Sequence, residues 1–445
     1  MHADISIKPD FALSTKTHRN VRIKSNFLYS RKNMPYCEPS NLGIVACPGG
    51  KVFAEQIIKH LTHMYKHRFT LKRDLISKRY EMSTTEFVEK ANFLNDIQTP
   101  EIAVKAGVDK YRNPKFLVDA EFTYFMNGEF KTEIKECIRG KDIFIVQDVE
   151  NHQVLELNGG KNKMKLSVND HVMSLLVTID AVRQSGAKDI TLVLPVYPYS
   201  RQHKKKGREG LTASLLGHIY ENMGVKRIIT LDIHSREIVN AFDTLNLENL
   251  HGSYQIIREL SKLIDLGPDG DDLVIVSPDT GAVDRNKFYA TGLKKPLAMI
   301  YKERDYSVVT QDAKSTNIKS VKILGDVQDK VVFLADDMLG TGGTLLKAME
   351  FLKEKGASKV IAAISLPFFT GNAIEQFDEA YKKGYFYRII GTNAVYHEEL
   401  LQKEWFIGTD VSALFANVIC RLHYNQSLSD LLDNREIIEK LVKHE

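Results

Sequence analysis

The most informative part of this sequence is Val331-Val332-Phe333-Leu334-Ala335-Asp336-Asp337-Met338-Leu339-Gly340-Thr341-Gly342-Gly343-Thr344. Its apolar beginning is typical of a buried strand in a parallel sheet, and we expect this strand to end at the two adjacent carboxylates. A turn of small residues follows, and a helical pattern begins at Leu345. Such a turn directs backbone N–H groups and a helix N-terminus towards an anion, and Thr341 and Thr344 add hydroxyl donors. We therefore predict a phosphate-binding loop, with Asp336 and Asp337 placed to bind sugar hydroxyls or a hydrated divalent cation.

Short apolar runs alternate with helical patterns along most of the chain. The runs that we interpret as strands are residues 42–46, 142–147, 190–194, 227–231, 273–276, 297–301, 331–335 and 360–365. The helical patterns cover residues 51–64, 170–184, 212–223 and 345–355. Strands that alternate with helices favour parallel sheets built from right-handed crossovers. We therefore predict an α/β fold with two halves, each built on a mainly parallel sheet flanked by helices.

The same patterns suggest the domain boundaries. Residues 1–40 are polar and basic without a clear period, which predicts an N-terminal extension. An N-terminal domain of residues 41–251 follows, and its charge-rich part from about 65 to 118 predicts an inserted, largely helical segment. The C-terminal domain then comprises residues 252–445, with the phosphate-binding loop and a C-terminal segment.

A β-hairpin is expected soon after the insertion. Two strand-like runs, residues 121–126 and 131–138, flank the sequence Asn127-Gly128-Glu129. An Asn-Gly pair between two such runs is a strong local signal for a tight turn. The hairpin would present Phe125, Asn127 and Glu129 at or beside its turn.

The composition limits the class of protein. The chain has 445 residues, of which 43% are hydrophobic and 27% charged, and this is enough for two domains with buried cores. The net charge is only +4, so we expect no nucleic-acid or membrane partner. The cysteines show no metal-binding or disulfide spacing and fit a reducing cytoplasm, and they are Cys37, Cys47, Cys137 and Cys420. The N-terminus is polar where a signal peptide would be apolar, and no apolar run reaches the roughly 20 residues of a membrane span.

Two further strand ends carry groups suited to phosphate or to a metal. In Ser277-Pro278-Asp279-Thr280-Gly281, the turn amides could bind a pyrophosphate group, with Asp279 on a cation and the following Arg285 on negative charge. In Asp232-Ile233-His234-Ser235, His234 follows a strand at the edge where open α/β sheets bind ligands, so it could ligate a metal or contact a phosphate. An ordinary turn and a structural histidine are the alternatives.

Two basic segments also follow strands. The first contains Arg201, Gln202 and His203, and it fits a solvated surface, a nucleic-acid patch or a triphosphate partner equally well. The second contains Lys302 and Arg304, and two cations two residues apart can lie on one side of an extended segment. They could neutralise charge on a transferring phosphoryl group, while the polar residues 305–322 predict a mobile lid. The sequence contains no Walker-type G-x-x-x-x-G-K-[ST], so any ATP would be held without a P-loop.

Taken in order, these motifs closely resemble the ribose-phosphate pyrophosphokinases, also called phosphoribosyl pyrophosphate synthetases. The resemblance covers nearly all of residues 120–430, and its motifs lie at residues 127–129, 138–147, 169–171, 197–202, 232–235, 241–243, 277–279, 302–304, 325–327 and 336–338. It implies two phosphoribosyltransferase-like domains and an Mg²⁺-dependent transfer of the β,γ-diphosphate of ATP to the 1-hydroxyl of ribose 5-phosphate. It also implies a homo-oligomer, a dimer or a hexamer, in which a neighbouring subunit completes the ATP site.

The resemblance implies a role for each matching residue. It assigns ATP binding to Phe125, Asn127 and Glu129 of the adenine-contacting hairpin, and to Arg201, Gln202 and His203 of the basic loop. His234 and Asp279 match the metal and ATP-phosphate site, and Lys302 and Arg304 match the catalytic pair of the flexible loop. The ribose hydroxyls are assigned to Asp336 and Asp337, and the 5-phosphate to Gly340, Thr341, Gly342, Gly343 and Thr344.

Three departures from the family pattern leave alternatives open. The family usually has Asp in place of His203 and of Gly340, and a second Gly in place of Ala282. Gly340 removes a side chain and a negative charge from the 5-phosphate loop, so a 5-substituted ribose such as ADP-ribose, giving ADP-ribose pyrophosphate, is an alternative acceptor. A non-catalytic, nucleotide-binding regulatory subunit is a second alternative, although Lys302 and Arg304 are intact. A nucleobase phosphoribosyltransferase is a third, but such an enzyme needs no adenine hairpin.

Overall fold

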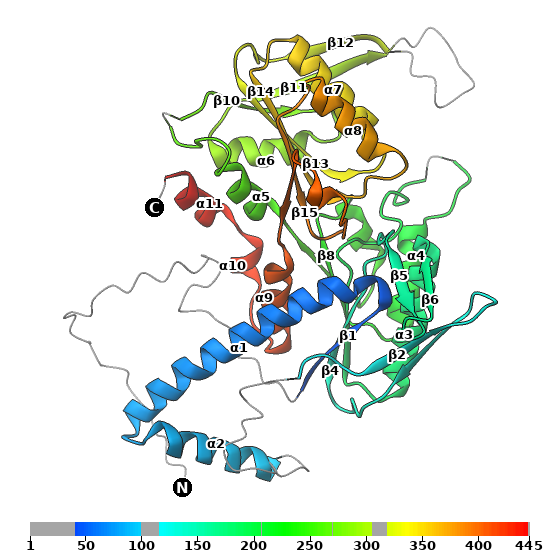
Figure 1. Cartoon of the computed structure of the whole chain (residues 1–445), viewed down its shortest axis with the longest axis vertical. Helices are drawn as coiled ribbons and strands as arrows, with labels where there is room; N and C mark the ends of the chain where they lie inside the picture. Colours follow the sequence, from blue (N-terminus) through cyan, green and yellow to red (C-terminus); the bar gives the residue numbers. More distant parts are fainter. Residues whose placement is uncertain (1–40, 99–114, 206, 269, 305–317, 444–445) are drawn as a thin grey trace. The chain divides into compact units, whose positions relative to one another are not determined.

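A computed structural model describes residues 41–98, 115–205, 207–268, 270–304 and 318–443 (Figure 1). All of these residues belong to the unit formed by residues 35–445. The predicted N-terminal extension lies outside the described residues. Within the described ranges the chain forms two large sheets, one of five strands and one of seven, and two small hairpin sheets.

The first large sheet is parallel throughout, as predicted for this half of the chain. Its order is β1 (Leu42–Ala46), β4 (Asp142–Val146), β7 (Asp189–Val193), β8 (Arg227–Leu231) and β9 (Asn246–Leu250). The β4 residues from Ile143 to Val146 are all buried, because helices cover both faces of such a sheet. The edge strand β9 was not predicted, because its sequence Asn-Leu-Glu-Asn-Leu contains few apolar residues.

The second large sheet is parallel except at one edge. Its order is β12 (Ile318–Leu324), β11 (Leu297–Arg304), β10 (Leu273–Ser277), β13 (Val331–Leu339), β14 (Lys359–Pro367), β15 (Arg388–Thr392) and β16 (Phe406–Thr409). Only β11 and β12 pair antiparallel among these described strands. The predicted mobile loop over 305–322 is therefore wrong for residues 318–322, which belong to β12. Residues 305–317 lie outside the described residues.

Helices connect the strands as the α/β pattern predicted. They are α1 (Lys51–Arg79), α2 (Thr84–Gln98), α3 (Val168–Gln184), α4 (Thr212–Asn222), α5 (Ser253–Leu260), α6 (Val283–Leu293), α7 (Gly343–Glu354), α8 (Ala373–Lys382), α9 (Ser412–His423), α10 (Ser429–Leu432) and α11 (Arg435–Val442). In Figure 1, α7 and α8 lie on one side of the seven-stranded sheet, and α5 and α6 lie on the other. Among the described residues, no helix is both long and apolar enough to span a membrane.

The helix α1 is about twice as long as predicted. Its first part is buried and packs on α9, where the rings of Phe53 and Phe415 meet edge to face with centroids 5.1 Å apart. Its second part continues to Arg79 and packs on α2 through Phe69 and Phe87, whose ring centroids are 6.0 Å apart. The charged segment predicted to be helical is therefore largely helical as far as residue 98, and residues 99–114 lie outside the described ranges.

Two hairpins stand beside the first sheet. The predicted hairpin consists of β2 (Ala120–Tyr124) and β3 (Phe130–Ile134), and Gly128 in its turn has a φ of +92°. A second hairpin of β5 (Val154–Leu157) and β6 (Asn162–Lys165) was not predicted. The Asn158 side chain joins the two, because its amide exchanges hydrogen bonds of 2.7 and 2.8 Å with the backbone of Tyr124.

Candidate active site

The sequence from β13 to α7 forms a strand, a tight turn and a helix. The pairing of β13 with β14 continues through Asp336 to Leu339, so the strand is four residues longer than predicted. Gly342 has a φ of +72°, and a side chain at this position would collide with the ring of Phe377. No side chain caps α7, which begins at Gly343, so its first backbone N–H groups are left for an anion.

A cavity of about 390 Å³ opens at this turn, a volume suited to a small ligand. It brings together ten of the residues that the sequence assigned to the site, namely Arg201, His234, Asp279, Asp336, Asp337, Gly340, Thr341, Gly342, Gly343 and Thr344. Its other lining residues are Gly281, Ala282, Arg285, Met338, Leu339, Leu345 and Ile364. The predicted phosphate-binding loop and the two adjacent acids therefore line the same cavity.

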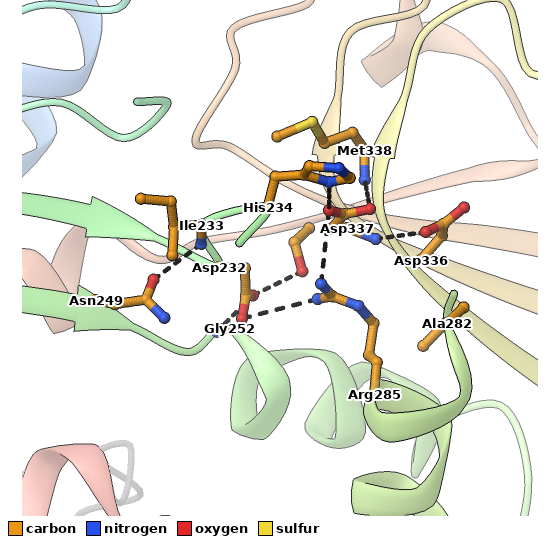
Figure 2. A network of polar contacts seen from close by, with 12 residues as sticks. Asp232, Ile233, His234, Asn249, Gly252, Ala282, Arg285, Asp336, Asp337 and Met338 are labelled. Atoms are coloured by element: carbon orange, nitrogen blue, oxygen red, sulfur yellow. Dashed lines mark hydrogen bonds and ion pairs between the residues drawn. The ribbon is translucent and has the colours of Figure 1, made fainter. Parts of the chain in front are cut away.

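Asp337 is the centre of a polar network inside this cavity (Figure 2). Its Oδ2 atom lies 2.7 Å from Nδ1 of His234 and 3.7 Å from Nη2 of Arg285. Its Oδ1 atom accepts a hydrogen bond of 2.9 Å from the backbone N–H of Met338, and its own N–H donates to Asp336. His234 follows β8 of the first sheet, whereas Asp337 lies in β13 of the second. The network thus joins the two halves of the chain.

Asp232 holds the opposite side of Arg285. It has a φ of +42° and lies 3.9 Å from Nη1 of Arg285. Its carboxylate accepts hydrogen bonds from His251 at 2.8 Å, from the Gly252 N–H at 3.2 Å and from the Ser365 hydroxyl at 2.6 Å. From the sequence we expected Arg285 to contact negative charge. In the structure this charge comes from the carboxylates of Asp232 and Asp337. Asp232 was quoted only as part of its motif, and His251 and Ser365 were missed.

The network shifts the pKa values of Asp336 and Asp337 in opposite directions. Burial opposes ionisation of Asp337, but the hydrogen bond from His234 and the charge of Arg285 lower its pKa. Burial and the neighbouring Asp337 raise the pKa of Asp336. The pKa of Arg285 is raised, because Asp232 and Asp337 outweigh the effect of its burial. Asp337 therefore keeps its negative charge as the pH falls, and Asp336 is the first of the two acids to be protonated.

Asp279 and His234, which the sequence assigned to a cation, both line the cavity. Asp279 Oδ1 accepts hydrogen bonds of 2.9 and 3.0 Å from the N–H groups of Gly281 and Ala282, which fixes the carboxylate at the cavity wall. Because Asp337 engages Nδ1 of His234, Nε2 is the nitrogen left for a metal. The described residues contain no group of three or more metal-binding side chains. The Asp279 carboxylate fits Mg²⁺, which prefers oxygen ligands and would also be bound by substrate phosphates, and the imidazole of His234 would be an additional ligand.

Three residues of the basic loop after β7, Arg201, Gln202 and His203, have different surroundings. The guanidinium of Arg201 lines the cavity and lies 5.9 Å from the ring centre of Phe368. Gln202 instead accepts a hydrogen bond of 2.6 Å from Thr212 at the start of α4. The ring of His203 meets that of His234 edge to face, with centroids 5.3 Å apart. Only Arg201 of the three therefore lines the cavity.

Comparisons with known proteins agree with this architecture. A model of the N-terminal domain of ribose phosphate pyrophosphokinase matches residues 104–224, and a phosphoribosyl transferase domain model matches residues 243–400. Ribose-phosphate pyrophosphokinase A of Dictyostelium discoideum is 35% identical over 312 residues, covering 70% of this chain and 88% of that protein. Ribose-phosphate pyrophosphokinase 1 of Listeria monocytogenes is 33% identical over 337 residues, covering 75% and 93%.

The chain belongs to the ribose-phosphate pyrophosphokinase family. A crystal structure of phosphoribosylpyrophosphate synthetase from Mycobacterium smegmatis has the same fold, with a TM-score of 0.62 and 25% identity, and covers 86% of this chain and 99% of the solved one. The resemblance seen in the sequence and the prediction of two phosphoribosyltransferase-like domains are confirmed.

The adenine hairpin expected in this pyrophosphokinase lies apart from the cavity. Phe125 is 43% exposed, and none of Phe125, Asn127 and Glu129 lines the cavity. The hydrogen bonds found at the turn are internal, including one of 3.2 Å from the Glu129 N–H to Asn127. The hairpin is therefore a preformed surface with an exposed aromatic ring.

The expected catalytic pair lies in the strand β11. Lys302 and Arg304 pair with β12 through their backbones, and the register shifts between Glu303 and Arg304. Both lie beyond Met299, the last β11 residue that pairs with β10. Their side chains lie outside what the structure describes, so their catalytic role stays a prediction.

Proposed function

We propose that this protein transfers the β,γ-diphosphate of ATP to the 1-hydroxyl of ribose 5-phosphate, forming phosphoribosyl pyrophosphate and AMP. The observation that carries the proposal is the cavity in which a phosphate loop, two carboxylates and a possible cation site meet. Relatives named ribose-phosphate pyrophosphokinase support the same activity. The acids and the loop account for the sugar phosphate, and Asp279 with His234 accounts for the nucleotide phosphates.

The acceptor would bind at the turn between β13 and α7. The free N–H groups of α7 and the hydroxyls of Thr341 and Thr344 would hold the 5-phosphate. Asp336 and Asp337 would accept hydrogen bonds from the 2- and 3-hydroxyls, and bonds to an ionised acceptor contribute about 1.5–3 kcal/mol each. Because His234 and Arg285 hold Asp337, the sugar would be oriented before the reaction begins.

The transfer itself requires positioning and charge neutralisation rather than a covalent intermediate. The oxygen of the 1-hydroxyl attacks the β-phosphorus in line, the bond from that phosphorus to the α-phosphate oxygen breaks, and AMP leaves while the hydroxyl proton is released. Asp279 and Nε2 of His234 would hold Mg²⁺, which neutralises phosphate charge when bound. Lys302 and Arg304 would approach the reacting phosphates from β11 and the segment that follows it.

ATP binding would also involve a second subunit. Phe125 presents an exposed ring, and aromatic faces of this kind stack on bases. Because the hairpin does not line the cavity of its own chain, we propose that a neighbouring subunit's hairpin holds the adenine in a homo-oligomer. A cytoplasmic location remains a prediction from the sequence.

One incubation tests the activity. The protein is mixed with Mg²⁺, ATP carrying a labelled β-phosphate, and either ribose 5-phosphate or ADP-ribose, and the products are identified by mass. We expect AMP together with phosphoribosyl pyrophosphate that carries the label, and we expect chelation of Mg²⁺ to abolish both. Formation of ADP, or no AMP above a chelated control, would refute the proposal. A product from ADP-ribose alone would keep the chemistry and change the acceptor.

A further inference from the structure

The side chain of Asn158 covers the outer edge of the hairpin β2–β3. Tyr124 pairs with Phe130 across the hairpin, but its own N–H and C=O bond to the Asn158 amide. The Oδ1 atom of Asn158 accepts from the Tyr124 N–H at 2.7 Å, and its Nδ2 atom donates to the Tyr124 carbonyl at 2.8 Å. The amide thus takes the place of a neighbouring strand, because it offers one acceptor and one donor side by side.

The turn between β5 and β6 holds this amide in place. Asn158 has a φ of +55°, and the two glycines that follow it have φ values of +65° and +85°. Asparagine tolerates this left-handed region better than most residues other than glycine. Leu157 is 3% exposed, and its carbonyl accepts a 3.1 Å hydrogen bond from the Gly160 N–H. The second hairpin therefore presents the Asn158 side chain to β2 from an anchored turn.

The contact lies next to the aromatic residue that the first hairpin would present to adenine. Phe125 follows Tyr124 directly, and it is 43% exposed. A two-stranded hairpin alone is marginally stable in water, so it needs support from outside. The strand β3 has such support from α3, where the hydroxyls of Thr132 and Thr178 lie 3.0 Å apart. For the end of β2, the hydrogen bonds with Asn158 provide it.

We propose that Asn158 is a positioning residue for ATP, which fixes the β2 backbone so that Phe125 is ordered before adenine binds. This inference rests on the proposed function, which assigns the hairpin β2–β3 to the adenine. Order in the unbound hairpin lowers the entropy cost of binding, so the effect of Asn158 belongs to the affinity for ATP. The binding of ribose 5-phosphate, at the turn between β13 and α7, does not depend on this contact.

The variant Asn158→Gly removes the contact and keeps the left-handed backbone accessible. Two neutral hydrogen bonds are lost, so we expect the KM for ATP to rise roughly tenfold. The KM for ribose 5-phosphate and kcat should each change less than about twofold. Glu156→Gln, an exposed change on the same hairpin, is the matched control and should leave all three constants near their wild-type values. An unchanged KM for ATP in Asn158→Gly, or an equal rise in both KM values, would overturn the inference.

Binding without turnover separates this inference from the proposed function. Calorimetry with Mg²⁺ and either ATP or inorganic tripolyphosphate compares the wild type with Asn158→Gly, and thermal unfolding and light scattering check the fold and the oligomer. We expect the affinity for ATP to fall roughly tenfold, and that for tripolyphosphate, which has no adenine, to stay within about twofold. Equal losses for both ligands would overturn the inference even if the wild type is an active pyrophosphokinase. A loss confined to ATP, in a protein that releases no AMP, would support the inference while the proposed function failed.

Discussion

The cavity at the end of β13 and the hairpin β2–β3 carry different parts of the same expected chemistry. In the cavity, Asp337 is 9% exposed and is held by His234 and Arg285 from two other segments. At the hairpin, Phe125 is 43% exposed and the turn bonds only to itself among the described residues. The groups that we propose for the sugar and the cation thus line one cavity of one chain, whereas the hairpin that we propose for the adenine lies outside that cavity. Changes in the two regions are expected to fail in different ways.

The largest effect is expected at the centre of the network. Asp337→Asn removes the ionised partner of His234 and Arg285 and one acceptor for the ribose hydroxyls. The variant loses the charge-assisted hydrogen bond with His234 and the one with a ribose hydroxyl, and each such bond contributes about 1.5–3 kcal/mol. We therefore expect kcat/KM for ribose 5-phosphate to fall by roughly 10³-fold. Steady-state kinetics at saturating ATP measure this. Asp336→Asn is the matched control, because Asp336 accepts from neither His234 nor Arg285, and a loss in the control equal to or above that of Asp337→Asn would contradict the network.

The next effect concerns β11, the strand that pairs with the edge strand β12 and contains Lys302. Lys302→Ala should lower kcat by about 10²-fold, a barrier of roughly 3 kcal/mol, while the affinity for ATP stays within a few fold. The reason is that its charge would matter most when charge spreads over the transferring group. Lys347→Ala on the exposed side of α7 removes a lysine near the loop as a control. A near-normal kcat in Lys302→Ala would remove this residue from the mechanism.

A smaller effect is expected on the pH dependence of stability, and it comes from Asp148, a buried acid that differs from Asp337. Asp148 at the end of β4 is 2% exposed, and its bonds come from the backbone N–H groups of Glu150 and Tyr396. Burial raises its pKa to about 7, whereas that of Asp337 is lowered by a cation and a histidine. A raised pKa in the folded state means that stability is lost as pH rises from about 4 through 7.

The variant Asp148→Asn should remove that pH dependence. Relative to the wild type, its free energy of unfolding should increase between pH 5 and pH 8 by on the order of 1–3 kcal/mol. Urea unfolding at several pH values provides the measurement. A constant difference between the two proteins over this range would show that Asp148 is ionised throughout.

Local patterns allowed much of this architecture to be predicted. The strand, turn and helix around Gly342 are coded by neighbouring residues, and ten of the residues that the sequence assigned to the site line one cavity. The end of β13 was misplaced because the acid pair resembles a strand terminus, while the pairing with β14 that carries the strand onward is not visible in one sequence. The hairpin β5–β6 was missed although Asn158-Gly159-Gly160 is a turn signal, since its strands carry little apolar pattern.

Long-range contacts explain what the sequence could not reveal. Asp232 and Asp337 meet across Arg285 although they are more than a hundred residues apart, and no spacing rule connects them. The same holds for Arg201 and Gly340, which come from different halves of the chain and lie beside each other. In both cases the residues come from different halves of the chain, and only the packing of the two halves brings them together.

The proposed division of the site between two chains is tested most directly by mixing two variants, each of which impairs one part of the site. Phe125→Ala alters the hairpin, and Asp337→Asn alters the cavity. If a neighbouring subunit supplies the hairpin, mixed oligomers contain sites with both parts intact, and activity should recover to roughly a quarter of the wild-type value for random dimers. Light scattering and mass measurements confirm that mixed oligomers form. Activity no higher than that of the separate variants, in a sample shown to contain mixed oligomers, would contradict the account.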